Sequence, residues 1–122
     1  MKRPLSSGLE GSVERAKRFV SDNLGQEITA IRVASEVRAS NCFVFLRLFE
    51  ETEGERFADF VKRTRVEKAR GLVLNPNYTE AEIASAVGFN NVTTFRRAFK
   101  KFHGESPTAY RKRIPRVLQR TD

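Results

Sequence analysis

The sequence predicts an all-α fold of about seven helices, arranged as two similar halves. Apolar residues recur every three or four positions along nearly the whole chain, which is the spacing of an amphipathic helix. No stretch alternates apolar and polar residues between turn residues, as a strand would. The sequence also matches itself when it is shifted by fifty residues, which indicates a duplicated helical unit.

The first two helices are expected behind a flexible leader, residues 1–11, which is rich in Pro, Ser and Gly. Apolar residues follow at helical spacing over residues 13–24, with Ser12 as the predicted N-cap and Gly25 as the predicted stop. Thr29 then precedes a shorter apolar run and is the predicted N-cap of a second helix.

The third and fourth helices are expected to be longer. Residues 41–53 predict the third helix, which ends at Gly54. Residues 57–74 form the longest periodic stretch and predict the fourth helix. This helix stops before Pro76, because a proline disfavours helical backbone at the residue before it.

Three more helices are expected in the remaining part of the chain. Thr79 is the predicted N-cap of a fifth helix that ends at Gly88, and residues 91–103 predict a sixth that ends at Gly104. The Ser-Pro pair at 106–107 opens a short seventh helix, because proline is favoured in the first turn. The predicted parts are a leader (1–11), a first subdomain (12–54), a linker helix (55–75), a second subdomain (76–114) and a tail (115–122).

Charge is distributed unevenly over these parts. Lys and Arg outnumber Asp and Glu by 23 to 15, a net charge of +8, and residues 1–20, 21–60 and 61–122 sum to +3, −4 and +9. Such a net charge favours a polyanionic partner, with nucleic acid first and an anionic membrane surface second. The alternative is a soluble protein that is basic but has no polyanionic partner. A polyanion is expected to bind the second half more strongly.

Composition argues against several classes of protein. No run approaches the roughly 18 apolar residues of a membrane span. Cys42 is the single cysteine, so no internal disulfide can form and the cytoplasm is the expected compartment. His103 is the single histidine, and with one cysteine and no acidic cluster a metal site is not expected. No cofactor is expected either. An enzyme is not expected either, because the chain shows no paired carboxylates, Gly-rich phosphate loop or nucleophile–His pair.

Within residues 29–55, ten residues are identical to the residue fifty positions further on. They are Thr29/Thr79, Ala34/Ala84, Ser35/Ser85, Val37/Val87, Asn41/Asn91, Phe45/Phe95, Arg47/Arg97, Phe49/Phe99, Gly54/Gly104 and Glu55/Glu105. The shared apolar positions are those that would face a core. Each copy therefore has a short capped helix, a break of three or four residues and a longer helix, which is the outline of a helix-turn-helix.

Two features would affect how such a chain binds DNA, namely the turn inside each copy and the long helix between the copies. The second copy has Gly88 at its break, whereas the first has Arg38, so the first turn is expected to be built differently or to be strained. A helix over residues 57–74 spans about 27 Å. Successive major-groove faces lie about 34 Å apart. Such a rigid connector is expected to let two recognition helices enter successive grooves.

The segment 83–110, IASAVGFNNVTTFRRAFKKFHGESPTAY, resembles the C-terminal signature of the AraC/XylS family of bacterial transcription regulators. The family pattern is I-A-x-x-V-G-F, then x-F-x-R-x-F-K-K, then G-x-S-P-x-x-Y-R, and every fixed position is matched here. Residues 57–74 resemble the family's linker helix, with its R-x-x-K-A pattern at Arg65, Lys68 and Ala69. The resemblance covers about residues 13–113.

The resemblance implies two homeodomain-like helix-turn-helix subdomains joined by a linker helix. It also implies a nucleoid-associated transcription regulator, usually an activator, that binds double-stranded promoter DNA in a sequence-specific way and contacts RNA polymerase. Many members carry a separate sensor domain, and none fits in this chain, so a free-standing regulator or a fragment of a longer one is expected.

The resemblance also implies which residues would contact DNA. Base contacts are expected from Phe43, Leu46 and Arg47 in the first recognition helix and from Val92, Thr93, Arg96 and Arg97 in the second. Phosphate contacts are expected from Thr29, Ser40, Asn41, Thr79, Asn90, Asn91, Lys100 and Lys101.

The two copies differ at the positions that would meet DNA. The first recognition helix is largely apolar where the family commonly has polar residues, and Glu50 and Glu51 stand where the second copy has Lys100 and Lys101. Acidic side chains there repel phosphate, so the first subdomain is expected to bind DNA more weakly, although Arg47 remains able to contact a guanine.

Several residues keep two interpretations. Arg97 either donates to guanine O6 and N7 or forms an ion pair with Glu80 or Glu82, and Arg47 has the same two roles open to it. Phe43 either contacts a thymine methyl group or packs at the rim of the core. Other phenylalanines are expected in the core, namely Phe45, Phe49, Phe95, Phe99 and Phe102. For the whole chain, the alternative is a helical protein–protein adaptor with a basic face.

Overall fold

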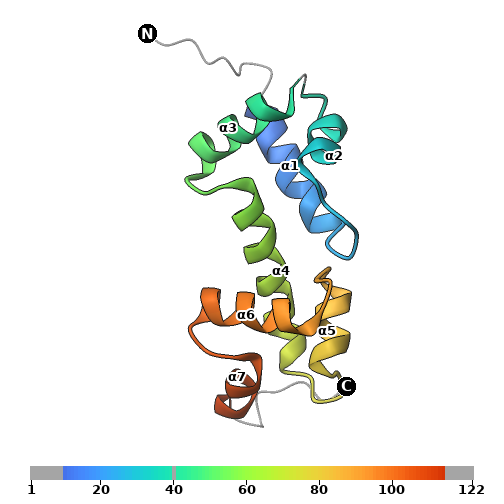
Figure 1. Cartoon of the computed structure of the whole chain (residues 1–122), viewed down its shortest axis with the longest axis vertical. Coiled ribbons are helices and arrows are strands. Elements are labelled where there is room, and N and C mark those ends of the chain that lie inside the picture. Colours follow the sequence, from blue (N-terminus) through green and yellow to red (C-terminus); the bar gives the residue numbers. More distant parts are fainter. Residues whose placement is uncertain (1–9, 40, 115–122) are drawn as a thin grey trace. The chain divides into compact units, whose positions relative to one another are not determined.

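The computed structural model describes residues 10–39 and 41–114. Within these residues the chain forms seven α-helices and no strand (Figure 1), which confirms the predicted all-α fold. The helices are α1 (Glu10–Asp22), α2 (Ala30–Glu36), α3 (Cys42–Glu53), α4 (Phe57–Val73), α5 (Glu80–Ala86), α6 (Val92–His103) and α7 (Pro107–Arg113). The predictions made for residues 1–9, for Ser40 and for residues 115–122 lie outside the described residues.

The helices form two compact units whose boundary, between Val61 and Lys62, lies within α4. The first unit contains α1, α2, α3 and the beginning of α4, and the second contains the rest of α4 with α5, α6 and α7 (Figure 1). Each unit has its own hydrophobic core, and α4 contributes to both. Its residues Phe57 and Phe60 belong to the first core, whereas Val66 belongs to the second.

Phenylalanine rings fill the core of the first unit. Phe45 and Phe49 of α3 are fully buried and meet Phe57 of α4 edge to face, with ring centroids 5.4 and 5.2 Å away. Phe60 lies 5.2 Å from Phe49. Such tilted ring pairs stabilise a core beyond the effect of the area they bury, so the predicted core positions of α3 are confirmed.

The core of the second unit is built on the equivalent rings of α6. Phe95 and Phe99 are fully buried, 5.8 Å apart, and Phe99 also meets Tyr110 of α7 at 5.7 Å. His103 packs against Phe99 and stacks on Tyr110, with ring centroids at 4.7 and 6.1 Å. Phe102 is only half-buried at the edge of this core, so its predicted core position is correct only in part.

The predicted helix ends recur in both units. A side-chain oxygen accepts a hydrogen bond from a first-turn backbone N–H at the two predicted N-caps, Thr29 and Thr79. Asn41 and Asn91, predicted as the first residues of their helices, cap them in the same way. Gly54 and Gly104 end α3 and α6 with φ of 76° and 80°, a left-handed backbone that glycine adopts without steric cost. Ser106 caps α7 and Pro107 occupies its first turn, as predicted.

The predicted start of the first helix is wrong. Since α1 begins at Glu10, residues 10 and 11 of the expected leader are helical, and Ser12 lies inside the helix instead of capping it. Ser12 is buried, and its hydroxyl donates to the carbonyl of Val37 at 3.5 Å and accepts from Arg15 at 3.2 Å. The serine therefore joins α1 to the end of α2, which local sequence does not reveal.

The predicted stop at Gly25 is also wrong. The helix ends earlier, at Asp22, and the side-chain amide of Asn23 donates to the carbonyl of Phe19 at 2.8 Å. This hydrogen bond satisfies one of the carbonyls that every helix end leaves without a backbone partner.

The two helix-turn-helix breaks have the same hydrogen bonds. The N–H of Ala39 donates to the carbonyl of Ala34 at 2.8 Å, and the N–H of Phe89 donates to that of Ala84 at 2.9 Å, which is the Schellman pattern. This pattern needs a left-handed residue before the donor, which is Arg38 (φ 61°) in the first copy and Gly88 (φ 100°) in the second. The first turn is therefore built like the second, and its arginine is strained.

Candidate nucleic-acid interface

Helix α6 is buried on one side and strongly basic on the other. Phe95, Ala98 and Phe99 pack into the core of the second unit. The other side exposes a hydroxyl group and four cations, on Thr93, Arg96, Arg97, Lys100 and Lys101. Because the aromatic side of the helix is fixed in the core, the basic side must face solvent or a partner.

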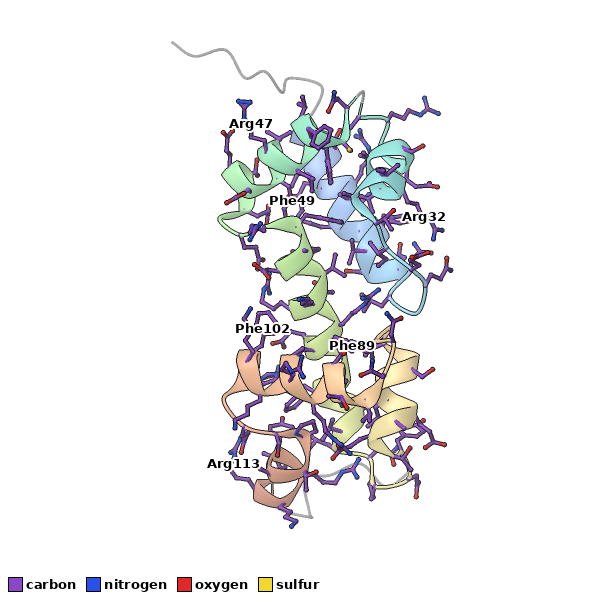
Figure 2. The ribbon with its side chains drawn as sticks, viewed as in Figure 1. Arg32, Arg47, Phe49, Phe89, Phe102 and Arg113 are labelled. Carbon is purple, nitrogen blue, oxygen red and sulfur yellow. The ribbon has the colours of Figure 1, made fainter. Side chains whose placement is uncertain are left out.

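Helix α3 has the same buried side but a different exposed one. Figure 2 shows Phe49 pointing into the first unit and Arg47 projecting away from it. Near the start of the helix, Phe43 is 77% exposed and Val44 is 38% exposed. A phenylalanine ring with this exposure gains little from packing against the core, so rim packing is a poor explanation of Phe43.

Four of the seven predicted base-contact residues are polar or charged, and all four lie on the surface. Arg47, Thr93, Arg96 and Arg97 are exposed. Leu46 and Val92 are half-buried and pack against the first and second cores, respectively. Because Leu46 and Val92 are half-buried, less of their side-chain surface can contact a base than for the exposed residues of the same helices.

The ion pair considered for Arg97 is formed instead by its neighbour, Arg96. The Nε of Arg96 donates to Oε1 of Glu80 at 2.6 Å. Glu82 is occupied elsewhere, because its carboxylate accepts the N–H of Thr79 in a capping box at the start of α5. Arg97 makes no ion pair within residues 10–39 and 41–114, and neither does Arg47.

Glu80 is the acidic centre of a small network on the second unit. Its second carboxylate oxygen, Oε2, accepts a hydrogen bond from the hydroxyl of Thr108 in α7. Burial opposes the charge of Glu80, but the hydrogen bonds from Thr108 and Arg96 and the nearby guanidinium charges outweigh it and lower its pKa. Glu80 is therefore ionised at neutral pH and links α5, α6 and α7.

The predicted phosphate-contact residues fall into two groups. Thr29, Asn41, Thr79 and Asn91 use a side-chain oxygen as an N-cap, and the amides of the two asparagines keep their N–H donors. The second group, Asn90, Lys100 and Lys101, is exposed, and the Lys101 ammonium lies 5.5 Å from the ring of Phe102. Helix starts with free donors are suited to bind phosphate oxygens.

Charge separates the two recognition helices sharply. Helix α3 contains one arginine and three glutamates, whereas α6 contains four lysines and arginines and no acidic residue. Both Glu50 and Glu51 are exposed. The side chains that make the two copies differ in charge are therefore exposed to solvent, as predicted.

Sequence reasoning missed the roles of three residues that organise the second unit. It considers Glu80 only as a partner of Arg97, whereas Glu80 and Thr108 hold Arg96, and the only local signal is an acidic residue in the first turn of a helix. The third, Arg111, donates to the carbonyls of Val73, Asn75 and Tyr78 and so closes the end of α4. The arginine of the Y-R motif could have drawn attention to Arg111, but not to its partners.

Two other kinds of site are absent from residues 10–39 and 41–114. No three side chains among its His, Cys, Asp and Glu residues are grouped so as to hold a metal ion. None of its helices is long and apolar enough to cross a membrane.

Comparison with protein families finds a match over residues 42–113 to the model described as "Helix-turn-helix domain". The regulatory protein PocR of Salmonella typhimurium is 30% identical over 105 residues, which are 86% of this chain and 34% of PocR. The chain spans about a third of the length of the curated relatives it matches.

Solved structures share the fold over most of its length. The C-terminal domain of AraT, a response regulator from Geobacillus stearothermophilus, aligns with a TM-score of 0.82 and 29% identity, covering 95% of this chain and 97% of that one. The DNA-binding domain of AdpA, solved in complex with a target DNA, aligns with a TM-score of 0.75 and 22% identity, covering 83% and 90%.

Proposed function

Since this chain belongs to the AraC-type family of helix-turn-helix transcription regulators, we propose that it binds two adjacent major-groove segments of one promoter, one with each recognition helix. Sequence-specific binding of DNA is the activity of the family. The observation that carries the assignment to α6 is its face of four exposed cations opposite a fully buried aromatic face. An α-helix of this kind fits the major groove.

In the second subdomain, Arg97 is the proposed reader of a guanine. Its guanidinium is exposed and has no acidic partner within residues 10–39 and 41–114, so its donors are available to guanine O6 and N7. Thr93 and Arg96 are the other proposed base contacts of α6, with Val92 at the edge. Lys100 and Lys101, near the end of the helix, are proposed to bind phosphates.

In the first subdomain, Phe43 is the proposed contact to a thymine methyl group. Its ring is the most exposed large apolar side chain among the described residues. A thymine methyl is the apolar group that the major groove offers. Arg47 is the proposed guanine contact of this helix, with Leu46 beside it, and the amide of Asn41 is placed to donate to a phosphate.

The wider role is proposed from the family and from the relatives. AdpA is described as solved with a target DNA and PocR as a regulatory protein, and we propose a promoter as the partner of this chain. We also propose that it activates transcription through contact with RNA polymerase, in the nucleoid.

The test is a selection of bound duplexes from a random pool, followed by a salt titration with the winning duplex. We expect a motif with two separated parts, the stronger one assigned to α6. Log K should fall linearly with log salt, with a slope of about −0.9 for each phosphate that a lysine or arginine neutralises. A flat salt response with no enriched motif would instead favour a protein–protein adaptor.

A further inference from the structure

Arg96 is held in one place on the exposed face of α6. Its Nε donates to Glu80 Oε1 at 2.6 Å, and Glu80 Oε2 accepts the hydroxyl hydrogen bond of Thr108. The side chain of Glu80 is 16% exposed and that of Arg96 is 55% exposed. The carboxylate is thus shielded by the helices around it, while the outer part of the guanidinium faces solvent.

This pairing leaves the base-reading donors of Arg96 available. Only the Nε hydrogen is used by Glu80, so the four hydrogens on Nη1 and Nη2 remain. Two amino groups side by side match the spacing of O6 and N7 on a guanine edge. The contact with Glu80 therefore orients the guanidinium and does not hide it.

The first copy of the helix-turn-helix folds without this network. Fifty residues before Glu80, Arg96 and Thr108 the chain has Ala30, Leu46 and Ala58, none of which can form it. Two of them, Ala30 and Leu46, pack against the first core instead. Because the same helix arrangement forms there with apolar residues at these three positions, the fold does not require a charged network at this place.

We propose that Glu80, supported by Thr108, is a positioning residue that fixes Arg96 for bidentate recognition of one guanine. The inference rests on the proposed function. A free arginine samples many rotamers and loses that freedom when it binds, whereas one that is already ordered loses less. The negative charge of Glu80 also weakens the attraction of the guanidinium for phosphate in general, so discrimination rises while binding to unrelated DNA falls.

The experiment measures binding of the full chain to its selected duplex and to duplexes in which each G·C pair of the second half-site is exchanged for A·T. Arg96→Ala should lower discrimination at one guanine by about 5- to 150-fold. Glu80→Ala should lower it at the same guanine by about 2- to 10-fold and raise affinity for an unrelated duplex. Glu80→Gln keeps an acceptor for Nε and should retain most of the discrimination.

A double variant separates positioning from a structural role. Because Glu80 acts through Arg96, the variant Glu80→Ala with Arg96→Ala should discriminate no worse than Arg96→Ala alone. Thr108→Val, which keeps the shape but removes the hydroxyl, should show a smaller loss than Glu80→Ala at the same guanine. If Glu80→Ala does not fold, the loss of discrimination in Thr108→Val tests the proposal in its place.

Three results would overturn the inference while leaving the proposed function standing. They are unchanged discrimination in both Glu80→Ala and Thr108→Val, a further loss in the double variant, and an Arg96→Ala variant that discriminates like the wild type. If the wild type shows no preference for its selected duplex over a scrambled one, the proposed function fails and this inference fails with it.

Discussion

The two copies of the helix-turn-helix agree where they are buried and differ where they face outward. Phe45 and Phe95 are both 0% exposed and hold the same place in their cores. Yet the exposed Phe43 of α3 stands where α6 has the exposed Thr93. A close-packed core accepts few side chains at a given position, whereas an exposed position accepts many, so one scaffold carries two different binding surfaces.

The electrostatic contrast divides the proposed work between the copies. The four cations of α6 attract any duplex, so we propose that this helix provides most of the affinity. The three glutamates of α3 repel phosphate, so we propose that this helix relies on close apolar and arginine contacts with the correct bases. Five predictions test how far this comparison holds.

The largest effects are expected from the shared core. Phe45→Ala and Phe95→Ala should each lower the free energy of unfolding by about 3–5 kcal/mol, because both rings are fully buried among other rings. Urea unfolding followed by far-UV circular dichroism measures this, with exposed Phe43→Ala as the control. A cost confined to one copy would break the equivalence of the two cores.

Next in size is the difference between the equivalent arginines. Arg97→Ala should lower discrimination at one base pair by about 1–3 kcal/mol, and Arg47→Ala should lower it less, because the glutamates beside it already weaken that half-site. Competition binding with single-base-pair variants measures both. Lys101→Ala is the control, since loss of a phosphate contact weakens all sequences alike. Equal losses on cognate and scrambled duplexes for Arg97→Ala would refute base recognition.

Replacing acidic residues of α3 with the lysines of α6 should reduce the difference in DNA affinity between the two copies. The double variant Glu50→Lys with Glu51→Lys should bind all duplexes roughly 10-fold more tightly and steepen the salt slope by up to about 1.8, the value for two further phosphate contacts. Fluorescence anisotropy over a salt series measures both quantities. The matched Glu50→Gln, Glu51→Gln variant should give a smaller gain in affinity without the steeper slope. An unchanged slope in the lysine variant would mean that this end of α3 does not approach DNA.

Exchanging the residues at the two turns should shift stability in opposite directions. Arg38→Gly removes a strained left-handed arginine and should raise the free energy of unfolding by roughly 1 kcal/mol, whereas Gly88→Ala should lower it by about 1–2 kcal/mol. Thermal and urea unfolding measure the two variants. A destabilised Arg38→Gly would show that the arginine side chain contributes more than its backbone costs.

The smallest effect is the pH dependence of Glu80, which has no counterpart in the first copy. Its folded pKa lies below the ordinary 4.5, so its contribution to stability is fully present above that pH and is lost as the pH falls through the folded value. Urea unfolding of the wild type and Glu80→Gln at several acidic pH values measures the difference. A difference that stays constant on acidification would contradict the lowered pKa.

Local signals explain why so much of the fold could be predicted. The capping oxygens of Asn41 and Asn91 and the left-handed Gly54 and Gly104 act within one helical turn, so their effect is visible in sequence. The start of α1 was missed for the complementary reason. Ser12 looks like a cap, but its hydroxyl is used 25 residues away, at the Val37 carbonyl.

The sequence by itself determined the helices, the duplication, and the buried and basic sides of α6, because each follows from a short repeating pattern of apolar and charged residues. Only the tertiary structure decided which arginine Glu80 holds. Arg96 and Arg97 are neighbours in sequence but point about 100° apart around the helix axis, and the packing of α5 and α7 against α6 brings Glu80 and Thr108 to the first of them.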